Sequence, residues 1–143
     1  MQYLGIIPAR FQSTRFPGKP LTLIDGKSMI RRVYERSSAV FEYVCVATDD
    51  LRIFDEVKSF GGNAVMTSEK HRSGTDRCYE ALQIVEKKDS AKFEVIVNVQ
   101  GDEPFIEPGQ LLELMNCFND RNTQIATLVK KFSPEEDIFT LNT

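Results

Sequence analysis

The chain has 143 residues, of which 41% are hydrophobic and 27% charged, and this is the composition of one water-soluble domain with a sizeable core. Its net charge of -3 at pH 7 argues against a nucleic-acid polymer as partner, because proteins that bind such polymers usually carry a broad basic face. No apolar run approaches the ~20 residues that span a bilayer and no basic segment precedes the first apolar run, so we expect neither a membrane partner nor secretion.

The amino-terminal run Tyr3–Pro8 is nearly all apolar, which is typical of a strand buried on both faces of a parallel sheet. The loop that follows, residues 9–21, carries the cations Arg10, Arg15 and Lys19. The first 24 residues contain no Asp or Glu, so no acidic neighbour in the sequence neutralises these cations. Such a local excess of positive charge predicts a ligand that carries phosphate groups.

Two prolines stiffen this loop, because Pro17 and Pro20 fix their own φ angles. We expect the loop to meet phosphate oxygens with its cationic side chains and with the backbone amides near Gly18. The P-loop pattern does not apply, because Lys19 is followed by proline and the first glycine of that pattern is missing. A solvated basic turn is the alternative interpretation.

Strand and helix patterns then alternate along the chain. Helix starts are predicted at Ser28, at Thr48-Asp49-Asp50, at Ser73 or Thr75, and at Pro108. Further strands are predicted over Tyr43–Ala47, Asn63–Met66, Val95–Val99 and Ile125–Val129. The helix after Ser28 is expected to use Ile30, Val33, Tyr34, Val40 and Phe41 on its apolar face and to leave Arg31, Arg32, Glu35 and Arg36 for solvent. This alternation predicts an α/β fold with a doubly wound, mainly parallel sheet, and we expect residues 1–143 to form a single domain.

Ligands of such a sheet bind beyond the carboxyl ends of the strands. The polar groups that follow predicted strands are Arg10, Asp49, the Ser73-Gly74 loop and Asp102. We therefore expect one cleft to receive all of them, with Asp102 as a ligand of Mg²⁺, a cation that prefers one or two carboxylates together with phosphate oxygens and water. A turn-capping role is the alternative for Asp102. The pair Asp49-Asp50 is expected to cap a helix, and Glu103, which precedes Pro104, is expected to extend away from the metal.

Cys45, Cys78 and Cys117 are odd in number and widely spaced, which supports neither a disulfide framework nor a zinc site. We expect all three to be buried apolar thiols in a reduced cytoplasm. His71 is the only histidine, so a Ser-His-Asp triad and a histidine-rich metal site have little support. We expect His71 to lie outside the functional site.

Four motifs between residues 8 and 104 carry a family resemblance. They are Pro8-Ala9-Arg10-x-x-Ser13-Thr14-Arg15-x-Pro17-Gly18-Lys19-Pro20-Leu21, Val46-Ala47-Thr48-Asp49, His71-Arg72-Ser73-Gly74-Thr75-Asp76-Arg77 and Asn98-Val99-Gln100-Gly101-Asp102-Glu103-Pro104. In this set and order the chain resembles the 3-deoxy-manno-octulosonate (Kdo) cytidylyltransferases, also called CMP-Kdo synthetases, over nearly its whole length. Members of that family continue for a second segment of comparable size, and this sequence stops soon after a helix-start signal at Ser133-Pro134-Glu135-Glu136. We therefore expect a truncated chain, the amino-terminal part of the family's chain.

The resemblance implies a Rossmann-like nucleotidyltransferase fold and a cytoplasmic, homodimeric enzyme of lipopolysaccharide biosynthesis. The implied reaction is cytidylyl transfer from CTP to the anomeric hydroxyl of Kdo, which gives CMP-Kdo and pyrophosphate. The alternatives are another acid-sugar nucleotidylyltransferase, of the sialic-acid type, or a nucleotide-binding fragment without catalysis.

The resemblance also implies roles for residues. Arg10 binds the α phosphate, Arg15 and Lys19 bind the β and γ phosphates, and Asp102 binds Mg²⁺, so that Arg10, Lys19 and Asp102 are the catalytic residues. A second metal aspartate is expected downstream of this sequence. Gln100 is implied at the Kdo site, where hydrogen bonding at the end of the sheet is the alternative. The pyrimidine is implied to lie against Pro8, Ala9, Ser73, Gly74 and Arg77, where helix capping is the alternative for Ser73.

Overall fold

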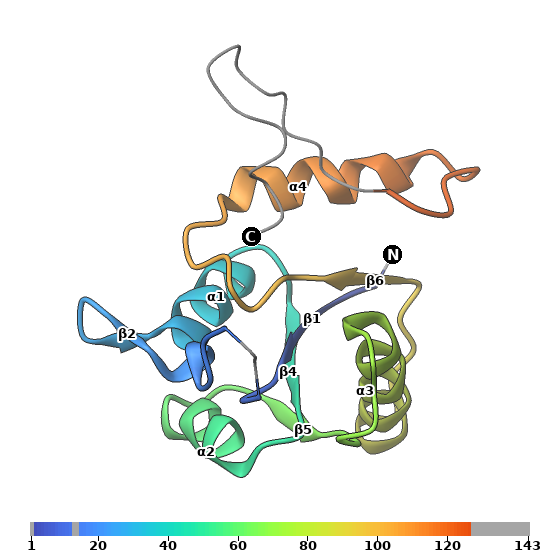
Figure 1. Cartoon of the computed structure of the whole chain (residues 1–143). Helices are drawn as coiled ribbons and strands as arrows, with labels where there is room; N and C mark the ends of the chain where they lie inside the picture. Colours follow the sequence, from blue (N-terminus) through green and yellow to red (C-terminus); the bar gives the residue numbers. More distant parts are fainter. Residues whose placement is uncertain (1, 13–14, 127–143) are drawn as a thin grey trace. The chain divides into compact units, whose positions relative to one another are not determined.

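Figure 1 shows the computed structural model of the chain, which describes residues 2–12 and 15–126. The chain divides into two compact units, Met1–Pro108 and Gly109–Thr143. No helix in this described part is long and apolar enough to cross a membrane.

The first unit is built on a parallel sheet whose central strand is β1. β4 pairs with one edge of β1, and β5 pairs with the far edge of β4. β6, which comes last in the sequence, pairs with the opposite edge of β1. The four strands, in the spatial order β5-β4-β1-β6, are β5 (Ala64–Met66), β4 (Tyr43–Thr48), β1 (Tyr3–Ala9) and β6 (Val95–Asn98). The predicted parallel sheet is confirmed.

Helices cover both faces of this sheet, as a doubly wound fold requires. The helices α1 (Met29–Ser38) and α2 (Leu51–Ser59) lie on one face, and α3 (Gly74–Asp89) lies on the other (Figure 1). Each begins at a residue whose side chain accepts a hydrogen bond from a backbone N–H of the first turn, and these residues are Ser28, Asp50 and Ser73. Such caps satisfy N–H groups that have no partner inside the helix, which is why the helix starts were predictable from sequence.

The core between the sheet and α3 is formed by small and branched apolar side chains. Its buried members are Leu4, Ile6, Cys45, Ala47, Val65, Cys78, Ala81 and Val85. Burial raises the pKa of Cys45 to about 12 and that of Cys78 to about 11, which keeps both thiols protonated and unreactive. The expectation of buried thiols is confirmed for these two and wrong for Cys117, which is exposed in the short 3₁₀ helix η2 (Cys117–Asn119).

Sequence reasoning missed a hairpin before α1. The two-residue strands β2 (Leu23–Ile24) and β3 (Lys27–Ser28) pair antiparallel across Asp25 and Gly26, whose φ angles are 50° and 82°. An Asp-Gly pair with both φ angles positive is the preferred two-residue turn between antiparallel strands, because its twist matches that of the strands. The signal was therefore present in the sequence.

The helix α1 is shorter than expected, and two of its arginines, Arg32 and Arg36, bond to backbone carbonyl groups, while Arg31 and Glu35 are exposed as expected. It ends at Ser38, so Phe41 is buried beyond the helix, where it packs against Gly5. A Cβ atom at Gly5 would lie 2.8 Å from the Phe41 ring, so glycine at this strand position makes room for the aromatic side chain. Arg32 donates to the carbonyl oxygen of Ile24 at 2.6 Å, and Arg36 donates to that of Ile106 at 3.1 Å.

The second unit contains the helix α4, whose span Pro108–Asn116 confirms the predicted start at Pro108. The predicted strand over residues 125–129 is not present in its first two residues, which have no regular structure. The rest of that strand and the helix-start signal at residues 133–136 lie outside the described residues.

Candidate functional site

The site lies where the order of the strands reverses. The strands β4 and β6 flank β1 from opposite sides, so the loops that leave the carboxyl ends of β1 and β6 border the same crevice, the place where doubly wound sheets bind ligands. Gly101, in the loop after β6, approaches the end of β1 so closely that a Cβ atom there would lie 3.0 Å from the carbonyl oxygen of Pro8. A side chain at this position would crowd that carbonyl oxygen, so glycine allows the close approach of the two loops.

The loop after β1 is closed on itself by Phe11 and Gly18. The N–H of Gly18 donates to the carbonyl oxygen of Phe11 at 2.8 Å, and Gly18 has the positive φ of 74° that glycine adopts without strain. The guanidinium of Arg52 stacks 3.3 Å from the centre of the Phe11 ring and so fixes the loop to α2. The N–H of Lys19 also has a partner, the carbonyl oxygen of Phe16 at 3.2 Å. The expectation that amides near Gly18 face the phosphates is therefore wrong for Gly18 and Lys19, because the loop uses both amides internally.

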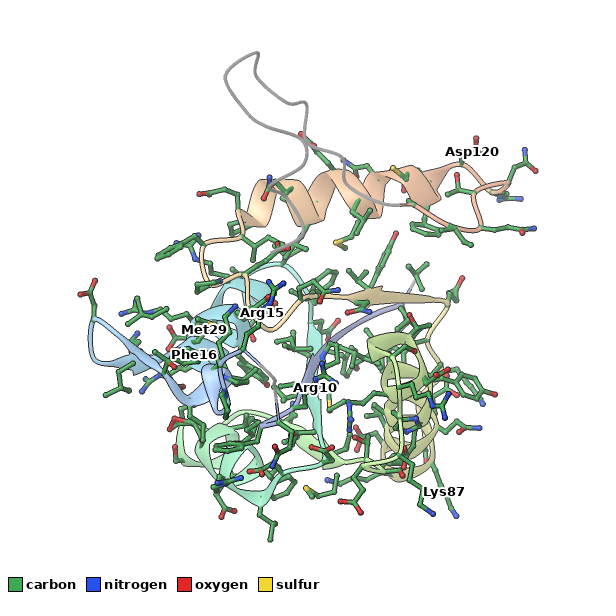
Figure 2. All side chains as sticks on the ribbon, in the orientation of Figure 1. Arg10, Arg15, Phe16, Met29, Lys87 and Asp120 are labelled. Atoms are coloured by element: carbon green, nitrogen blue, oxygen red, sulfur yellow. The ribbon has the colours of Figure 1, made fainter. Side chains whose placement is uncertain are left out.

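Lys19 and Asp102 bring the two loops together. Lys19 begins the 3₁₀ helix η1 (Lys19–Leu21), and its Nζ lies 3.6 Å from Oδ2 of Asp102. Both side chains are exposed, by 44% and 57%, so water and salt weaken their attraction and a charged ligand can replace either partner. Figure 2 labels Arg10, where β1 ends, and Arg15, further along the same loop.

A cleft of about 230 Å³ opens beside this pair, between the ends of β1 and β6 and the start of α3. Seven of the ten predicted site residues line it, and Arg15, Lys19 and Asp102 do not. At its back, a Cβ atom on Gly74 would lie 3.4 Å from Cγ of Pro8, which shows how closely the start of α3 approaches β1. The lining residues are Pro8, Ala9, Arg10, His71, Arg72, Ser73, Gly74, Arg77 and Gln100.

Two of the predicted nucleotide-binding side chains are bonded within the protein. The hydroxyl of Ser73 accepts from the N–H of Asp76 at 3.2 Å and donates to the Asp76 carboxylate at 3.0 Å, so it caps α3. Arg77 is only 4% exposed, and its guanidinium donates to the hydroxyl of Thr67, to the carbonyl oxygen of Ser68 and to Oδ2 of Asp49. Arg77 therefore connects the loop 67–73 to Asp49 at the end of β4.

Asp49 and Asp50 have separate roles. Asp50 is the N-cap of α2, as expected, and the Arg52 side chain and the backbone N–H groups that it accepts hold its pKa below the ordinary value. Asp49 does not cap the helix as expected, because its carboxylate forms the ion pair with Arg77. A second cavity of about 510 Å³ lies on this side of β1 and shares Arg10, His71 and Arg77 with the cleft.

His71 was expected outside the site and lies in it, where it lines both cavities. Its Nε2 bonds to Oε2 of Glu80, a residue on α3. The Glu80 carboxylate also accepts the N–H of Ser68 at 3.1 Å, and these two bonds, that with His71 first, hold its pKa below the ordinary value. The partners are nine residues apart across a loop, so periodicity gives no signal for the pair. The spacing of Arg77 and Glu80, which places them on one helix face, is the only hint in the sequence.

The described residues contain no group of three or more histidine, cysteine or acidic side chains that could enclose a metal ion. Asp102 offers one exposed carboxylate beside a cationic loop. This donor set does not suit a cation bound by protein alone. It does suit Mg²⁺ bound together with a phosphorylated ligand, because Mg²⁺ then takes one or two carboxylates and completes its shell with phosphate oxygens and water.

Comparison with known proteins places these motifs in a family. Residues 4–143 match the family model described as cytidylyltransferase. The 3-deoxy-manno-octulosonate cytidylyltransferase of Parabacteroides distasonis is 61% identical over 137 residues, which cover 96% of this chain and 53% of the relative. The enzyme of the same name from Bacteroides thetaiotaomicron is 57% identical over 136 residues, which cover 95% and 53%. The chain thus spans about half the length of these curated relatives.

Solved structures agree with the fold. A structure described as CMP:2-keto-3-deoxy-manno-octonic acid synthetase complexed with CTP is 43% identical, with a TM-score of 0.72 over 84% of this chain and 48% of that chain. A cytidylyltransferase from Leptospira borgpetersenii is 22% identical, with a TM-score of 0.71 over 85% of this chain and 51% of that chain. At that identity the second similarity concerns the fold alone.

Proposed function

This chain belongs to the cytidylyltransferase family, and we propose that the protein transfers the cytidylyl group of CTP to the anomeric hydroxyl of Kdo, which forms CMP-Kdo and releases pyrophosphate for lipopolysaccharide biosynthesis. One observation carries the proposal beyond the family: Lys19 and Asp102 meet at 3.6 Å at the strand-order reversal, beside a cleft lined by arginines. A cation for phosphates and a carboxylate for a divalent ion are the two charges that nucleotidyl transfer needs side by side.

The cationic loop would bind the triphosphate. Arg10 lines the cleft at the end of β1, which suits it to the α phosphate, while Arg15 and Lys19 come later in the same loop and would bind the β and γ phosphates. A triphosphate bound there would take Lys19 from Asp102, and the weakness of an exposed pair keeps the cost of that exchange small. The side chains bind and orient the phosphates, and little covalent chemistry is asked of the protein.

The cleft would hold the pyrimidine. Pro8, Ala9 and Gly74 provide a flat wall without long side chains, against which a base can lie. Ser73 and Arg77 would act on the base indirectly, because their side chains keep the start of α3 and the loop 67–73 in place.

Asp102 would hold Mg²⁺ with its exposed carboxylate. When bound, Mg²⁺ neutralises charge on the phosphate oxygens and stabilises the charge that develops at the reacting phosphorus. Glu103 remains predicted to extend away from the metal.

Gln100 would meet the acceptor sugar, since it lines the cleft on the side of β6. The names of the two curated relatives favour Kdo over a sialic acid as that acceptor. The free thiols of Cys45 and Cys78 suit the reducing cytoplasm, which is our proposed location. A homodimer remains our prediction for the assembly.

Pyrophosphate release by the intact protein tests the proposal. Each of the four nucleoside triphosphates would be offered with Mg²⁺, and the acceptor would be Kdo in one series and N-acetylneuraminate in another. We expect release with CTP and Kdo alone. Equal or faster release with ATP would contradict cytidylyl transfer, and release with N-acetylneuraminate in place of Kdo would contradict the acceptor.

A further inference from the structure

Two side chains of α3, one turn apart, fasten the loop 67–73 over the cleft. Arg77 binds the Thr67 hydroxyl and the Ser68 carbonyl oxygen, and Glu80 accepts the Ser68 N–H and bonds to His71 Nε2. The bonds of Arg77 are enough to explain why the loop is fixed to the helix. The bond between Glu80 and His71 has a further consequence, because it orients the His71 ring, which lines the cleft.

The Glu80 carboxylate determines which nitrogen of His71 carries the proton. An ionised carboxylate only accepts hydrogen bonds, so the nitrogen that faces it, Nε2, must be the donor. In a neutral imidazole one nitrogen donates and the other accepts, so His71 in this pairing keeps Nδ1 as an acceptor. Nδ1 is therefore the ring nitrogen left for a ligand, and it can only receive a hydrogen bond.

An acceptor is scarce among the side chains that line the cleft. Arg10, Arg72 and Arg77 are donors only, and the Ser73 hydroxyl is occupied by Asp76. Donors suit O2, the acceptor that both pyrimidines present, and a donor placed there does not distinguish cytosine from uracil. The two bases differ at N3, which accepts in cytosine and donates in uracil, and at C4, where cytosine carries an amino donor and uracil carries a carbonyl acceptor. An acceptor in the cleft can read the difference at C4.

We propose that Glu80 is a positioning residue that holds His71 in the tautomer with an accepting Nδ1, and that this acceptor selects cytosine over uracil by receiving the exocyclic amine. The inference rests on the proposed function, since it assigns the base to the cleft. Gln100, the other lining side chain with an acceptor atom, is assigned to the sugar. A uracil carbonyl placed against Nδ1 would meet a second acceptor, and an unpaired polar contact of that kind discriminates strongly between similar ligands.

Nucleotide affinity and the histidine tautomer test this together, in the intact protein. CTP, UTP and ATP are titrated calorimetrically into the wild type, Glu80→Gln, His71→Leu and His71→Asn. We expect the ratio of CTP to UTP affinity to fall about tenfold in Glu80→Gln and in His71→Leu, the usual size of one hydrogen bond. We expect His71→Asn to retain most of the ratio, because its amide oxygen lies near the level of the ring Nδ1. Nitrogen-15 spectra of the wild type should show the ring proton on Nε2 and an unprotonated Nδ1.

The outcomes separate the two proposals. ATP binding as tight as CTP binding would overturn the proposed function, whereas a clear CTP preference with an unchanged CTP to UTP ratio in Glu80→Gln would overturn only the role of Glu80. A wild-type ring with its proton on Nδ1, or with both nitrogens protonated, would overturn the inference whatever the nucleotide preference is. Should Glu80→Gln fail to fold, the comparison of His71→Leu with His71→Asn still decides, since equal ratios in the two contradict a selecting acceptor.

Discussion

The region around Lys19 and Asp102 differs from the loop 67–73 in how its charged groups are paired. Lys19 and Asp102 are both about half exposed and stand 3.6 Å apart. Arg77, in contrast, is 4% exposed, and it makes two bonds to the loop 67–73 and a third to Asp49. An exposed pair contributes little to stability and exchanges easily for a ligand, while a buried pair is costly to break. The half of the site that we propose for phosphate and metal thus has charged groups that exchange easily, and the half that we propose for the base has groups that are held in place.

The largest effect is expected from Asp102→Asn. The change keeps the size of the side chain and removes the charge that would hold Mg²⁺, so transition-state stabilisation should fall by several kcal/mol, which is about 10³-fold in rate or more. Pyrophosphate release against Mg²⁺ concentration measures it, with Tm followed in parallel.

Glu103→Gln is the matched control and should cost much less, because Glu103 is predicted to point away. A drop in Tm large enough to explain the lost activity of Asp102→Asn would make Asp102 a structural turn residue. It would also remove the contrast between the two regions.

Arg77→Ala should show the opposite behaviour, with the loss in stability. Removal of the guanidinium leaves Asp49 without its ion pair and leaves Thr67 and Ser68 without a donor, so the free energy of unfolding should fall by about 3 kcal/mol. Urea unfolding measures this value. Arg31→Ala serves as control, because Arg31 pairs with Glu35 on an exposed helix surface and should cost less than about 1 kcal/mol. A similar decrease in the free energy of unfolding in both variants would mean that the buried pair stabilises the protein no more than the exposed pair.

Lys19→Ala should weaken CTP binding and spare CMP. A charge-assisted contact to the β or γ phosphate is worth about 1.5–3 kcal/mol, and CMP lacks both phosphates. Calorimetric titration measures the affinities of CTP and CMP for the wild type and the variant. Lys92→Ala is the control for the loss of one positive charge, because Lys92 is 89% exposed and lies outside the proposed site. Equal losses for CTP and CMP would indicate a distorted loop, and no loss would support a solvated basic turn.

The smallest effect concerns acid stability of the loop 67–73. Bonds from His71 and from the Ser68 N–H hold the pKa of Glu80 below its ordinary value of 4.5. The stabilisation is therefore complete above pH 4.5 and is lost as the pH falls through the pKa of the folded state, because the unfolded state binds more protons in that window. We expect the Tm of Glu80→Gln to fall less steeply below pH 4.5 than that of the wild type. Equal slopes would show that Glu80 does not couple to folding.

The parts of the site that were predictable from sequence depend on local signals. Ser28 and Asp50 cap helices through bonds made within three residues, and the motif Asn98 to Pro104 follows an apolar strand. Because parallel strands end at one edge of a sheet, the strand pattern was enough to place the loops after β1 and β6 at the same edge, while the contact of Lys19 with Asp102 was not predicted. The turn at Asp25-Gly26 was also local, and its strand pair was missed because each strand has only two residues.

The parts that were not predictable depend on distant partners. Asp49 and Arg77 are 28 residues apart, and Asp49 has an equally good local alternative as a helix cap. The bond between His71 and Glu80 crosses a loop whose path no propensity determines. Gly18 looked like a phosphate-binding amide because its turn was recognised and its internal acceptor, Phe11, was not. In each case the sequence indicated a group able to form a hydrogen bond or an ion pair, but its partner was determined by the tertiary structure.

The dependence of CTP affinity on Mg²⁺ tests most directly whether the loops after β1 and β6 form one metal-triphosphate site. CTP would be titrated calorimetrically into the intact wild type and into Asp102→Asn, with and without Mg²⁺. We expect Mg²⁺ to strengthen CTP binding in the wild type and to have little effect in the variant, because we propose Asp102 as the carboxylate that joins the metal to the protein. An Asp102→Asn protein that keeps the full Mg²⁺ effect would contradict this account and would place the metal away from Asp102.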